Sequence, residues 1–332
     1  MYNPAALHLV WFRKGRKLVP NLSIVIPVYR AEGTLRELNR RLVAVLEAEG
    51  IKFEILFVED CGGDRSWELI QEIAAQDSRV RGLRMSRNYG QHSALLCGIR
   101  AARNEVVVTL DDDLQNPPEE IPKLMAKLAE GHDMVYGTRE QERHGFLRDM
   151  ASRITKWALQ NAMGAETARN VSAMRAFHTD LRQAFESYRS PTVNLDVLLT
   201  WGTTRFGSVM VQHEARQIGE SGYTLRKLIT HAVNLTTGFS TLPLQMASVT
   251  GFVFALFGFL ILGYVLLRFL LGGNSVPGFP FLASIIAIFS GVQLFALGII
   301  GEYLARMHFR SMDRPSYVVR EQVGLSTRNT DK

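Results

Sequence analysis

The stretch VVVTLDDDLQNPPEEI, residues 106–121, decides how this chain folds. A β-branched apolar run of the kind that forms a buried strand ends at Leu110. Three carboxylates follow at once, those of Asp111, Asp112 and Asp113. Two prolines and two glutamates come next, a composition typical of the first turn of a helix. The stretch therefore predicts a buried strand that leads through an acidic turn into a helix.

Two interpretations of the acidic turn remain open from these residues alone. A helix cap or a tight turn would account for one of the three aspartates, or for two at most. Three adjacent carboxylates repel one another, and a hard divalent cation such as Mg²⁺ or Mn²⁺ relieves that repulsion, often together with substrate phosphates. In open α/β sheets, ligands bind at the carboxyl ends of the strands, which is where these side chains stand.

Strand and helix patterns alternate through the first half of the chain. Strands are predicted at residues 22–29, 53–60, 80–86, 105–110 and 133–139, and helices at residues 34–49, 64–76, 92–102 and 117–130. This alternation predicts the α/β class, with a mostly parallel sheet and helices on both of its faces. Glu59 and Asp60 end the second strand, so this acidic pair is expected at the same edge of the sheet as the acidic turn.

The sequence lacks the motifs that are typical of several functional classes. No GxGxxG or GxxxxGK[ST] motif occurs, and neither do GxSxG, HExxH or paired Cys/His ligand spacings. The formal net charge of +6 suits phosphate ligands and anionic lipid headgroups. Nucleic acid is not expected as a partner, because no nucleic-acid-binding motif accompanies the charge. The two cysteines, Cys61 and Cys97, are expected to be reduced and structural.

Two long runs without Asp, Glu, Lys or Arg predict membrane spans. They cover residues 228–267 and 269–301, and the spans are expected near residues 244–267 and 279–301. The alternative is a pair of buried helices in a soluble core. The turn-forming link LGGNSVPG makes the pair a helical hairpin. Basic residues lie outside the hairpin, which predicts cytoplasmic ends on both sides. These flanking residues are Arg226, Lys227, Arg306, Arg310, Arg314 and Arg320.

The chain is therefore expected to have four parts. They are a basic extension, a cytoplasmic sheet domain with interface helices, a membrane region and a cytoplasmic tail, at residues 1–20, 21–227, 228–303 and 304–332. Within the sheet domain, GFLRDMASRITKWALQNAMG has apolar residues at helical spacing with basic residues between them. It is either an amphipathic helix on the membrane surface or an ordinary helix packed on the sheet.

The motifs SIVIPVY, SRNYGQHSAL and TLDDDLQNPPEEI resemble the family-2 glycosyltransferases, which have a GT-A (Rossmann-like) fold. GESGYTLRKL, the two apolar runs, GIIGEYLARM and RPSYVV resemble the polyprenyl-phosphate branch of that family. That branch includes transferases that load formamidoarabinose, glucose or mannose onto undecaprenyl phosphate, and the dolichyl-phosphate mannose synthases. The motifs RNYGQHSA and DDDLQNPPEEIP most resemble those of the formamidoarabinose transferases. The resemblance implies a membrane glycosyltransferase that supplies lipid-linked sugar for cell-envelope glycan or lipopolysaccharide.

The resemblance also implies a divalent cation, Mg²⁺ or Mn²⁺, at the acidic turn. Asp111 and Asp113 match the metal-binding DxD motif, and Gln115 matches a further metal ligand. Asp112 fills a position often held by alanine and is expected to point away from the cation. The pocket for a UDP- or GDP-linked sugar would comprise Pro27, Tyr29, Glu32, Asp60, Asp111 and Asp112.

For the acceptor, the resemblance implies a basic phosphate site. It would be formed by Arg139, Arg148, Ser152 and Arg216. The catalytic set would be Asp111, Asp113, Arg139 and Arg148. In this single displacement a lipid-phosphate oxygen attacks the anomeric carbon, and the nucleoside diphosphate leaves. Because a phosphate is already ionised near neutral pH, the reaction needs no strong general base.

The chain also departs from the family pattern. The segment ARNVSAMRAF has Arg169 and Asn170 where the family often has an aspartate, and Gly222 replaces a lysine in a Ser-Lys-Tyr triplet. Two other functions therefore stay open, a transferase acting on another membrane lipid or glycan, and a catalytically silent membrane scaffold. The resemblance implies a bacterial inner-membrane location and a homotetramer, and Gly291, Gly298 and Gly301 would permit close helix contact.

Overall fold

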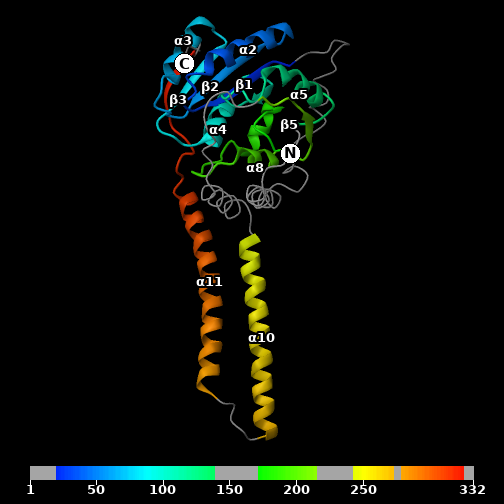
Figure 1. The fold of residues 1–332 in the computed structure, drawn as a ribbon, viewed down its shortest axis with the longest axis vertical. Coiled ribbons are helices and arrows are strands. Elements are labelled where there is room, and N and C mark those ends of the chain that lie inside the picture. Colours follow the sequence, from blue (N-terminus) through cyan, green and yellow to red (C-terminus); the bar gives the residue numbers. More distant parts are fainter. Residues whose placement is uncertain (1–19, 139–170, 215–241, 273–277, 325–332) are drawn as a thin grey trace, which may run out of the picture.

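The computed structural model describes residues 20–138, 171–214, 242–272 and 278–324. Within them, the chain forms one sheet domain and one pair of long helices that extends away from it (Figure 1). The strands are β1 (Leu22–Val28), β2 (Phe53–Glu59), β3 (Val80–Met85), β4 (Val106–Thr109), β5 (Met134–Thr138), β6 (Arg175–His178), β7 (Phe206–Met210) and β8 (Val319–Val323). The helices are α2 (Leu35–Ala48), α3 (Ser66–Gln76), α4 (Gln91–Ala101), α5 (Ile121–Leu128), α8 (Leu195–Thr200), α10 (Leu242–Gly272) and α11 (Phe279–Ser311), with short 3-10 helices η1 (Pro118–Glu120) and η2 (Thr179–Phe185).

The described strands form a mixed, mostly parallel sheet in the order β7-β5-β6-β4-β1-β2-β3-β8. Strand β1 lies at its centre and pairs in parallel with both β2 and β4. Strands β6 and β8 are antiparallel to their neighbours. The five strands predicted from the sequence are all present, and the predicted α/β fold is confirmed.

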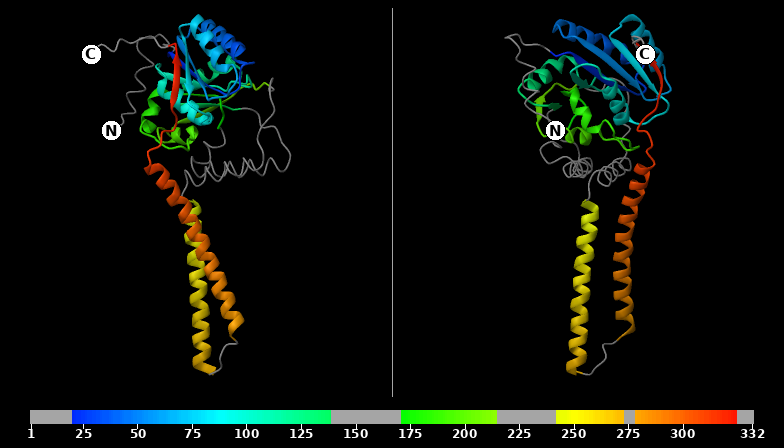
Figure 2. Two further views of the ribbon diagram at one scale, coloured as in Figure 1. Left: turned by 90° about the vertical axis from the view of Figure 1, so that its left-hand side faces the viewer. Right: turned by 180° about the vertical axis from the view of Figure 1, so that it is seen from behind.

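Helices cover both faces of the sheet (Figure 2). Leu35, Leu38, Leu42 and Leu46 project from one side of α2 into the same core as α3 and α5. Helices α4 and α8 pack on the opposite face, in a second core. Because both faces are covered, every residue of β1 and β2 is buried, as is usual in parallel sheets.

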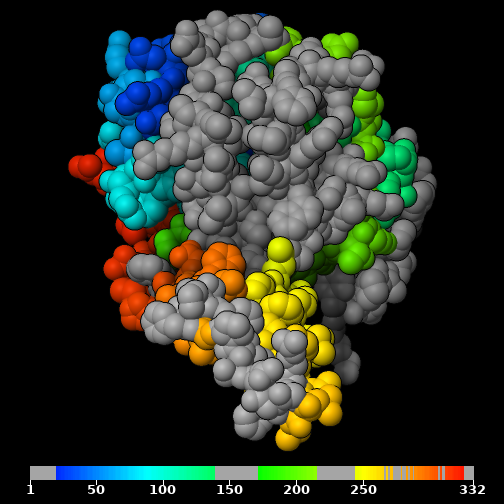
Figure 3. All heavy atoms as spheres, turned by 60° about the horizontal axis from the view of Figure 1, so that its bottom comes forward, coloured from blue at the N-terminus to red at the C-terminus, as the bar shows by residue number. Residues whose placement is uncertain are grey.

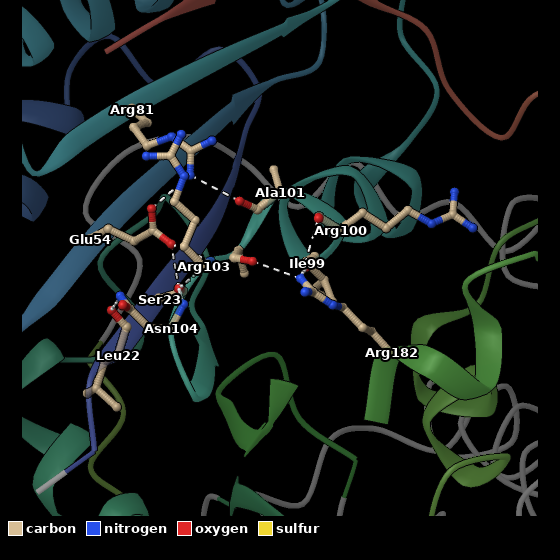
Figure 4. A network of polar contacts seen from close by, with 11 residues as sticks. Leu22, Ser23, Glu54, Arg81, Ile99, Arg100, Ala101, Arg103, Asn104 and Arg182 are labelled. Carbon is tan, nitrogen blue, oxygen red and sulfur yellow. Dashed lines mark hydrogen bonds and ion pairs between the residues drawn. The ribbon is translucent and has the colours of Figure 1, made fainter. Parts of the chain in front are cut away.

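A buried polar network closes the edge of the sheet where the strands begin (Figure 4). Glu54 at the start of β2 accepts hydrogen bonds from the hydroxyl of Ser23, at 2.6 Å, and from the guanidinium of Arg81, at 2.8 Å. The backbone N–H of Arg103 donates to the same carboxylate, at 2.7 Å. Each buried charge therefore has partners, and the network ties together the starts of β1, β2 and β3.

The two long helices have the length and composition of membrane spans. Candidate spans cover Leu244–Tyr264 in α10 and Ile288–Ala305 in α11, and almost none of either window is buried. The helices of a soluble core would bury such side chains, whereas Phe259 and Leu270 are 71% and 78% exposed. This exposure favours the membrane interpretation over the soluble one.

Helices α10 and α11 lie side by side, as the view from their end shows (Figure 3). The rings of Phe254 and Phe289 meet edge to face, with centroids 6.1 Å apart, and Gly258 lies against Phe289. A Cβ added at Gly291, Gly298 or Gly301 would meet nothing within 4 Å. These three glycines therefore do not accommodate the neighbouring helix of the same chain.

After α11 the chain returns to the sheet. Strand β8 pairs antiparallel with β3 at the edge of the sheet. The indole N–H of Trp67 donates to Glu321 at 3.0 Å, and the hydroxyl of Ser316 accepts from the backbone N–H of Ser190 at 3.2 Å. Part of the segment expected to be a tail is thus built into the fold, and it fastens the second long helix to the sheet domain.

Candidate functional site

Three neighbouring strands carry polar residues to one edge of the sheet. Strands β4, β1 and β2 are adjacent and parallel, so the residues that follow them lie at the same edge. Tyr29 follows β1, Asp60 follows β2, and Asp111 follows β4 after Leu110. The expectation that the two acidic clusters share an edge agrees with this topology.

The backbone is strained at the same three places. Arg30, Cys61 and Leu114 have φ angles of 56°, 56° and 62°, which lie in the left-handed region that residues with a Cβ avoid. Each of them stands just beyond β1, β2 or β4. Strain of this kind costs about 1–3 kcal/mol per residue and clusters at ligand-binding sites, where it aims side chains. It carries no signal in the sequence.

Each carboxylate of the acidic turn has a defined neighbour. The amide of Gln91 donates to Oδ1 of Asp111 at 2.6 Å. The backbone N–H of Tyr29 donates to Oδ2 of Asp112 at 2.9 Å, which joins the ends of β1 and β4. The backbone N–H of Gln115 donates to Oδ1 of Asp113 at 3.1 Å.

The environment of the acidic turn affects the pKa of the Asp112 carboxyl. The pKa of its carboxyl is raised to about 7, mainly by burial and also by the neighbouring charges of Asp111 and Asp113, while the hydrogen bond from the Tyr29 backbone acts in the opposite direction. Three ionised carboxylates therefore fit this turn poorly at neutral pH unless a cation offsets them. Within the four described ranges, no three His, Cys, Asp or Glu side chains are arranged to hold a metal ion. The expected set of Asp111, Asp113 and Gln115 would need ligand oxygens to complete it.

The residues expected to hold the nucleotide differ in exposure. Pro27 is buried within β1, and Tyr29 just beyond it is 47% exposed. Glu32 accepts from the backbone N–H of Arg65 at the start of α3, at 3.1 Å. Asp60 is only 3% exposed, and its two oxygens accept from the backbone N–H groups of Tyr89 and Gly90, at 2.7 Å each. Burial raises the pKa of Asp60, and these two hydrogen bonds act in the opposite direction.

The segment that follows β7 also contacts the acidic turn. Beyond β7, the backbone N–H of Glu214 donates to the carbonyl oxygen of Gln115 at 2.9 Å. The guanidinium of Arg41 on α2 lies 2.7 Å from the carboxylate of Glu119 and 3.0 Å from that of Glu214. These ion pairs fix the chain beside the turn. Sequence analysis missed Arg41 and Glu214, since a single charged residue on a helix or in a loop has no distinguishing pattern.

The residues expected at the acceptor phosphate, Arg139, Arg148, Ser152 and Arg216, lie outside the described residues. So do the amphipathic segment from Gly145 to Gly164 and the Ser221-Gly222-Tyr223 triplet. The described chain stops next to two of these positions. Thr138, which ends β5, directly precedes Arg139 and accepts from the backbone N–H of Val211 at 2.9 Å. Glu214 precedes Arg216 by two residues.

A buried carboxylate contacts Arg175, which belongs to the described part of the segment ARNVSAMRAF. Asp196 in α8 accepts from the hydroxyl of Tyr136 at 3.1 Å and lies 3.2 Å from the guanidinium of Arg175 in β6. Asp196 is 3% exposed. Its contacts make it a structural member of the second core rather than a base at the surface.

The cysteines are free, as expected. Cys97 is buried in α4, and burial raises the pKa of its thiol to about 12. Cys61 is exposed just beyond β2, so the expectation of a structural cysteine fits Cys97 and does not fit Cys61.

Comparison with known proteins relates both the sheet and the helix pair to characterised chains. A family model described as glycosyl transferase family 2 matches residues 23–185. An undecaprenyl-phosphate 4-deoxy-4-formamido-L-arabinose transferase from Pseudomonas paraeruginosa is 37% identical over 305 residues, which cover 91% of this chain and 90% of that protein. The transferase of the same name from Edwardsiella ictaluri is 34% identical over 92% of this chain and 95% of its own length.

Among solved structures, glucosyl-3-phosphoglycerate synthase from Mycobacterium tuberculosis in complex with Mn²⁺, uridine diphosphate and glucosyl-3-phosphoglycerate matches with a TM-score of 0.49. It is 20% identical over 68% of this chain and 84% of that one. The Staphylococcus aureus protein TarS, residues 1–349, in complex with UDP-GlcNAc matches with a TM-score of 0.45 and 17% identity, over 65% of each chain.

Proposed function

The chain belongs to glycosyl transferase family 2, and we propose that it moves a sugar from a nucleotide-sugar donor to a polyprenyl phosphate of the undecaprenyl type. One observation carries this proposal. The similarity to undecaprenyl-phosphate sugar transferases extends over 91% of the chain, whereas the family model ends at residue 185. The shared part therefore includes the two long apolar helices as well as the sheet domain.

The donor set at the acidic turn fits a divalent cation, Mg²⁺ or Mn²⁺. Asp111, Asp113 and Gln115 offer hard oxygen ligands. The pKa of Asp112 is raised mainly by burial and also by the two neighbouring carboxylates, whose negative charge a cation would offset. Asp112 itself is engaged by the backbone of Tyr29, which supports a structural role beside the cation. When bound, the cation supplies Lewis-acid stabilisation of the departing nucleoside diphosphate.

The nucleotide sugar, linked to UDP or GDP, would lie along the ends of β1, β2 and β4. Its pocket would comprise Pro27, Tyr29, Glu32, Asp60, Asp111 and Asp112. Support comes from the topology, which places these residues at the ligand edge of a mostly parallel sheet. The left-handed backbone beyond each of the three strands supports the same location.

The acceptor phosphate would be held by Arg139, Arg148, Ser152 and Arg216. Arginine suits this task because its planar fork of N–H donors matches phosphate oxygens. An oxygen of the lipid phosphate forms a bond to the anomeric carbon as the bond from that carbon to the nucleoside diphosphate breaks. Arg139 and Arg148, with the acidic turn, would orient the two phosphates.

The hairpin suits an acceptor that lies in a membrane. Helix α10 begins and α11 ends next to the sheet domain, and the end of α10 and the start of α11 lie far from it (Figure 1). We propose a multi-pass protein of the bacterial inner membrane, with the sheet domain and both termini in the cytoplasm. The lipid-linked sugar would supply cell-envelope glycan or lipopolysaccharide modification. A homotetramer remains our expectation from the family resemblance.

The test uses the purified full chain in detergent with undecaprenyl phosphate and Mg²⁺ or Mn²⁺. A panel of UDP- and GDP-sugars is screened for nucleoside diphosphate release and, by mass spectrometry, for a glycolipid. We expect one donor to give a metal-dependent glycolipid, and Asp113→Asn to give none. Release that depends on a different lipid or glycan would overturn the acceptor assignment. Failure of every donor to bind, even with metal, would favour the silent scaffold.

A further inference from the structure

Gln91 is the first residue of α4, and the sequence analysis assigned it no role. Its side-chain amide donates a hydrogen bond to Oδ1 of Asp111, with 2.6 Å between the nitrogen and the oxygen. We propose that Gln91 is a positioning residue, which sets the orientation of the Asp111 carboxylate toward the cation. This inference rests on the proposed function, because Asp111 matters in this way only as a metal ligand.

The chemistry of an amide suits this position. A carboxylate has about four lone-pair sites, so one N–H bond to Oδ1 leaves acceptor capacity for a cation on the same group. An amide N–H carries no net charge, so it can hold the carboxylate in place without competing with the cation. The positive charge of a lysine would compete with the cation. Partners of this kind orient metal ligands, and their loss weakens metal binding.

The start of α4 is itself held in place by the end of β2. Asp60 accepts from the backbone N–H groups of both Tyr89 and Gly90, the two residues before Gln91. Gly90 adopts a φ of 89°, which a residue with a Cβ would adopt only under strain. The hydrogen bonds from Asp60 therefore fix where α4 begins and so where the side chain of Gln91 can reach.

These contacts form a continuous path between two strand ends that do not touch. The path runs from Asp60 beyond β2, through the backbone of Tyr89 and Gly90, to Gln91 and then Asp111 beyond β4. Strand β1 lies between β2 and β4 in the sheet. We therefore expect a change at Asp60, on the nucleotide side of the edge, to alter cation affinity at Asp111.

The test measures Mn²⁺ binding by electron paramagnetic resonance, which detects the unbound ion, on the full chain in detergent with and without UDP. Gln91→Met keeps the size of the side chain and removes the donor, and Gln91→Ala removes both. We expect each to raise the Mn²⁺ dissociation constant about 10- to 100-fold. The transfer rate at saturating Mn²⁺ should be largely retained. Gln71→Ala, at an exposed glutamine of α3, is the matched control and should change neither.

The outcomes separate the inference from the proposed function. If wild-type protein binds no Mn²⁺, or Asp113→Asn binds it normally, the proposed cation site itself fails. If Asp113→Asn loses binding while Gln91→Met binds as tightly as wild type, the positioning role of Gln91 is wrong and the proposed function stands. If Gln91→Met binds Mn²⁺ as tightly as wild type and only Gln91→Ala binds it weakly, the effect comes from side-chain packing. This result would also overturn the inference.

The path from Asp60 has its own test. Asp60→Asn exchanges one acceptor oxygen for a donor that faces a backbone N–H, so it should weaken Mn²⁺ binding. Combined with Gln91→Met, it should add little to the single change, because both act through one contact. Gly90→Ala, which strains the same turn from within the backbone, gives a second route if Asp60→Asn does not fold. Fully additive losses would show that Asp60 does not act through Gln91.

Discussion

A left-handed backbone occurs at Arg30, Cys61 and Leu114, all at the edge of the sheet where we propose that the ligands bind. Each of these residues keeps a Cβ where glycine would fit more easily, so the edge carries conformational strain. The three strained residues follow β1, β2 and β4, and every residue of these strands is buried. Such a cost is tolerated where a turn must present its side chains or backbone in one orientation.

Cys61 allows this strain to be measured, because its side chain is exposed. Cys61→Gly removes the Cβ and should raise the melting temperature of the full chain in detergent by about 2–4 °C, as expected for about 1 kcal/mol of relieved strain. Cys61→Ala keeps the Cβ and removes only the thiol, so it should melt like wild type. Equal melting of all three proteins would show that the turn stores no such strain.

Asp113→Asn is the most direct change at the acidic turn. The amide keeps the size of the side chain and can still accept from the backbone N–H of Gln115, but it is a poor ligand for a hard cation. We expect glycolipid formation to fall about 100-fold or more, with the melting temperature of the metal-free protein within about 2 °C of wild type. Transfer at the wild-type rate would remove Asp113 from the site.

Arg148→Ala tests the acceptor side of the proposed site. Loss of one guanidinium should raise the apparent KM for undecaprenyl phosphate about tenfold or more, because a charge-assisted bond to phosphate is lost. The apparent KM for the nucleotide sugar should stay within about twofold, since that ligand is expected at the strand ends. An effect on the nucleotide sugar alone would place Arg148 in the donor pocket instead.

At the scale of helices and strands, the sequence predicted the elements with long apolar patterns. Strands β1 to β5 and helices α2 to α5 were found within a few residues, since their buried positions recur at the expected spacing. Strands β6, β7 and β8 were missed. Strand β8 reads VREQV, with only its first and last residues apolar, and it pairs with a strand more than 200 residues earlier in the chain. A partner so distant in sequence leaves no local signal.

The candidate site divides in the same way. The acidic turn and Asp60 could be selected as candidates because carboxylates directly after apolar strands are unusual and the family resemblance assigns them roles. Gln91 and Arg41 could not be found, since their importance depends on which side chains the fold brings opposite them. A polar residue on an exposed helix turn has the same appearance in a sequence whether or not it has such a partner.

Strand β8 depends on one glycine at its end. Gly324 has a φ of 74°, and a Cβ there would clash with the carbonyl oxygen of Val80. Gly324→Ala should therefore cost about 2–5 kcal/mol from strain and overlap together, and it should loosen β8 from β3. Gly50→Ala is the matched control, because Gly50 has a φ of 63° with nothing within 4 Å of an added Cβ. Limited proteolysis of the segment after α11 should be faster for Gly324→Ala than for Gly50→Ala.

At the scale of the whole molecule, the proposed orientation would let the hairpin and β8 hold the proposed site near the membrane. Helix α11 continues beyond its apolar window, which ends at Ala305, through residues 306–311 before the chain joins the sheet. Those six residues span about 9 Å of helix, comparable to the headgroup layer on one side of a bilayer. An acceptor whose phosphate lies among the headgroups would then be within reach of a site at the sheet edge, without the lipid leaving the membrane.

This arrangement predicts opposite accessibility for the two ends of the hairpin. Cys61 is exposed on the sheet domain, and the buried thiol of Cys97, with its pKa raised to about 12, should react slowly. In spheroplasts, a membrane-impermeant maleimide should label Cys61 only after lysis. A cysteine introduced by Ser275→Cys in a Cys61→Ala background should be labelled without lysis, because Ser275 lies in the link between the two helices. Labelling of Cys61 in intact spheroplasts would place the sheet domain outside the cell, where no nucleotide sugar is available, and would contradict both the orientation and the proposed donor.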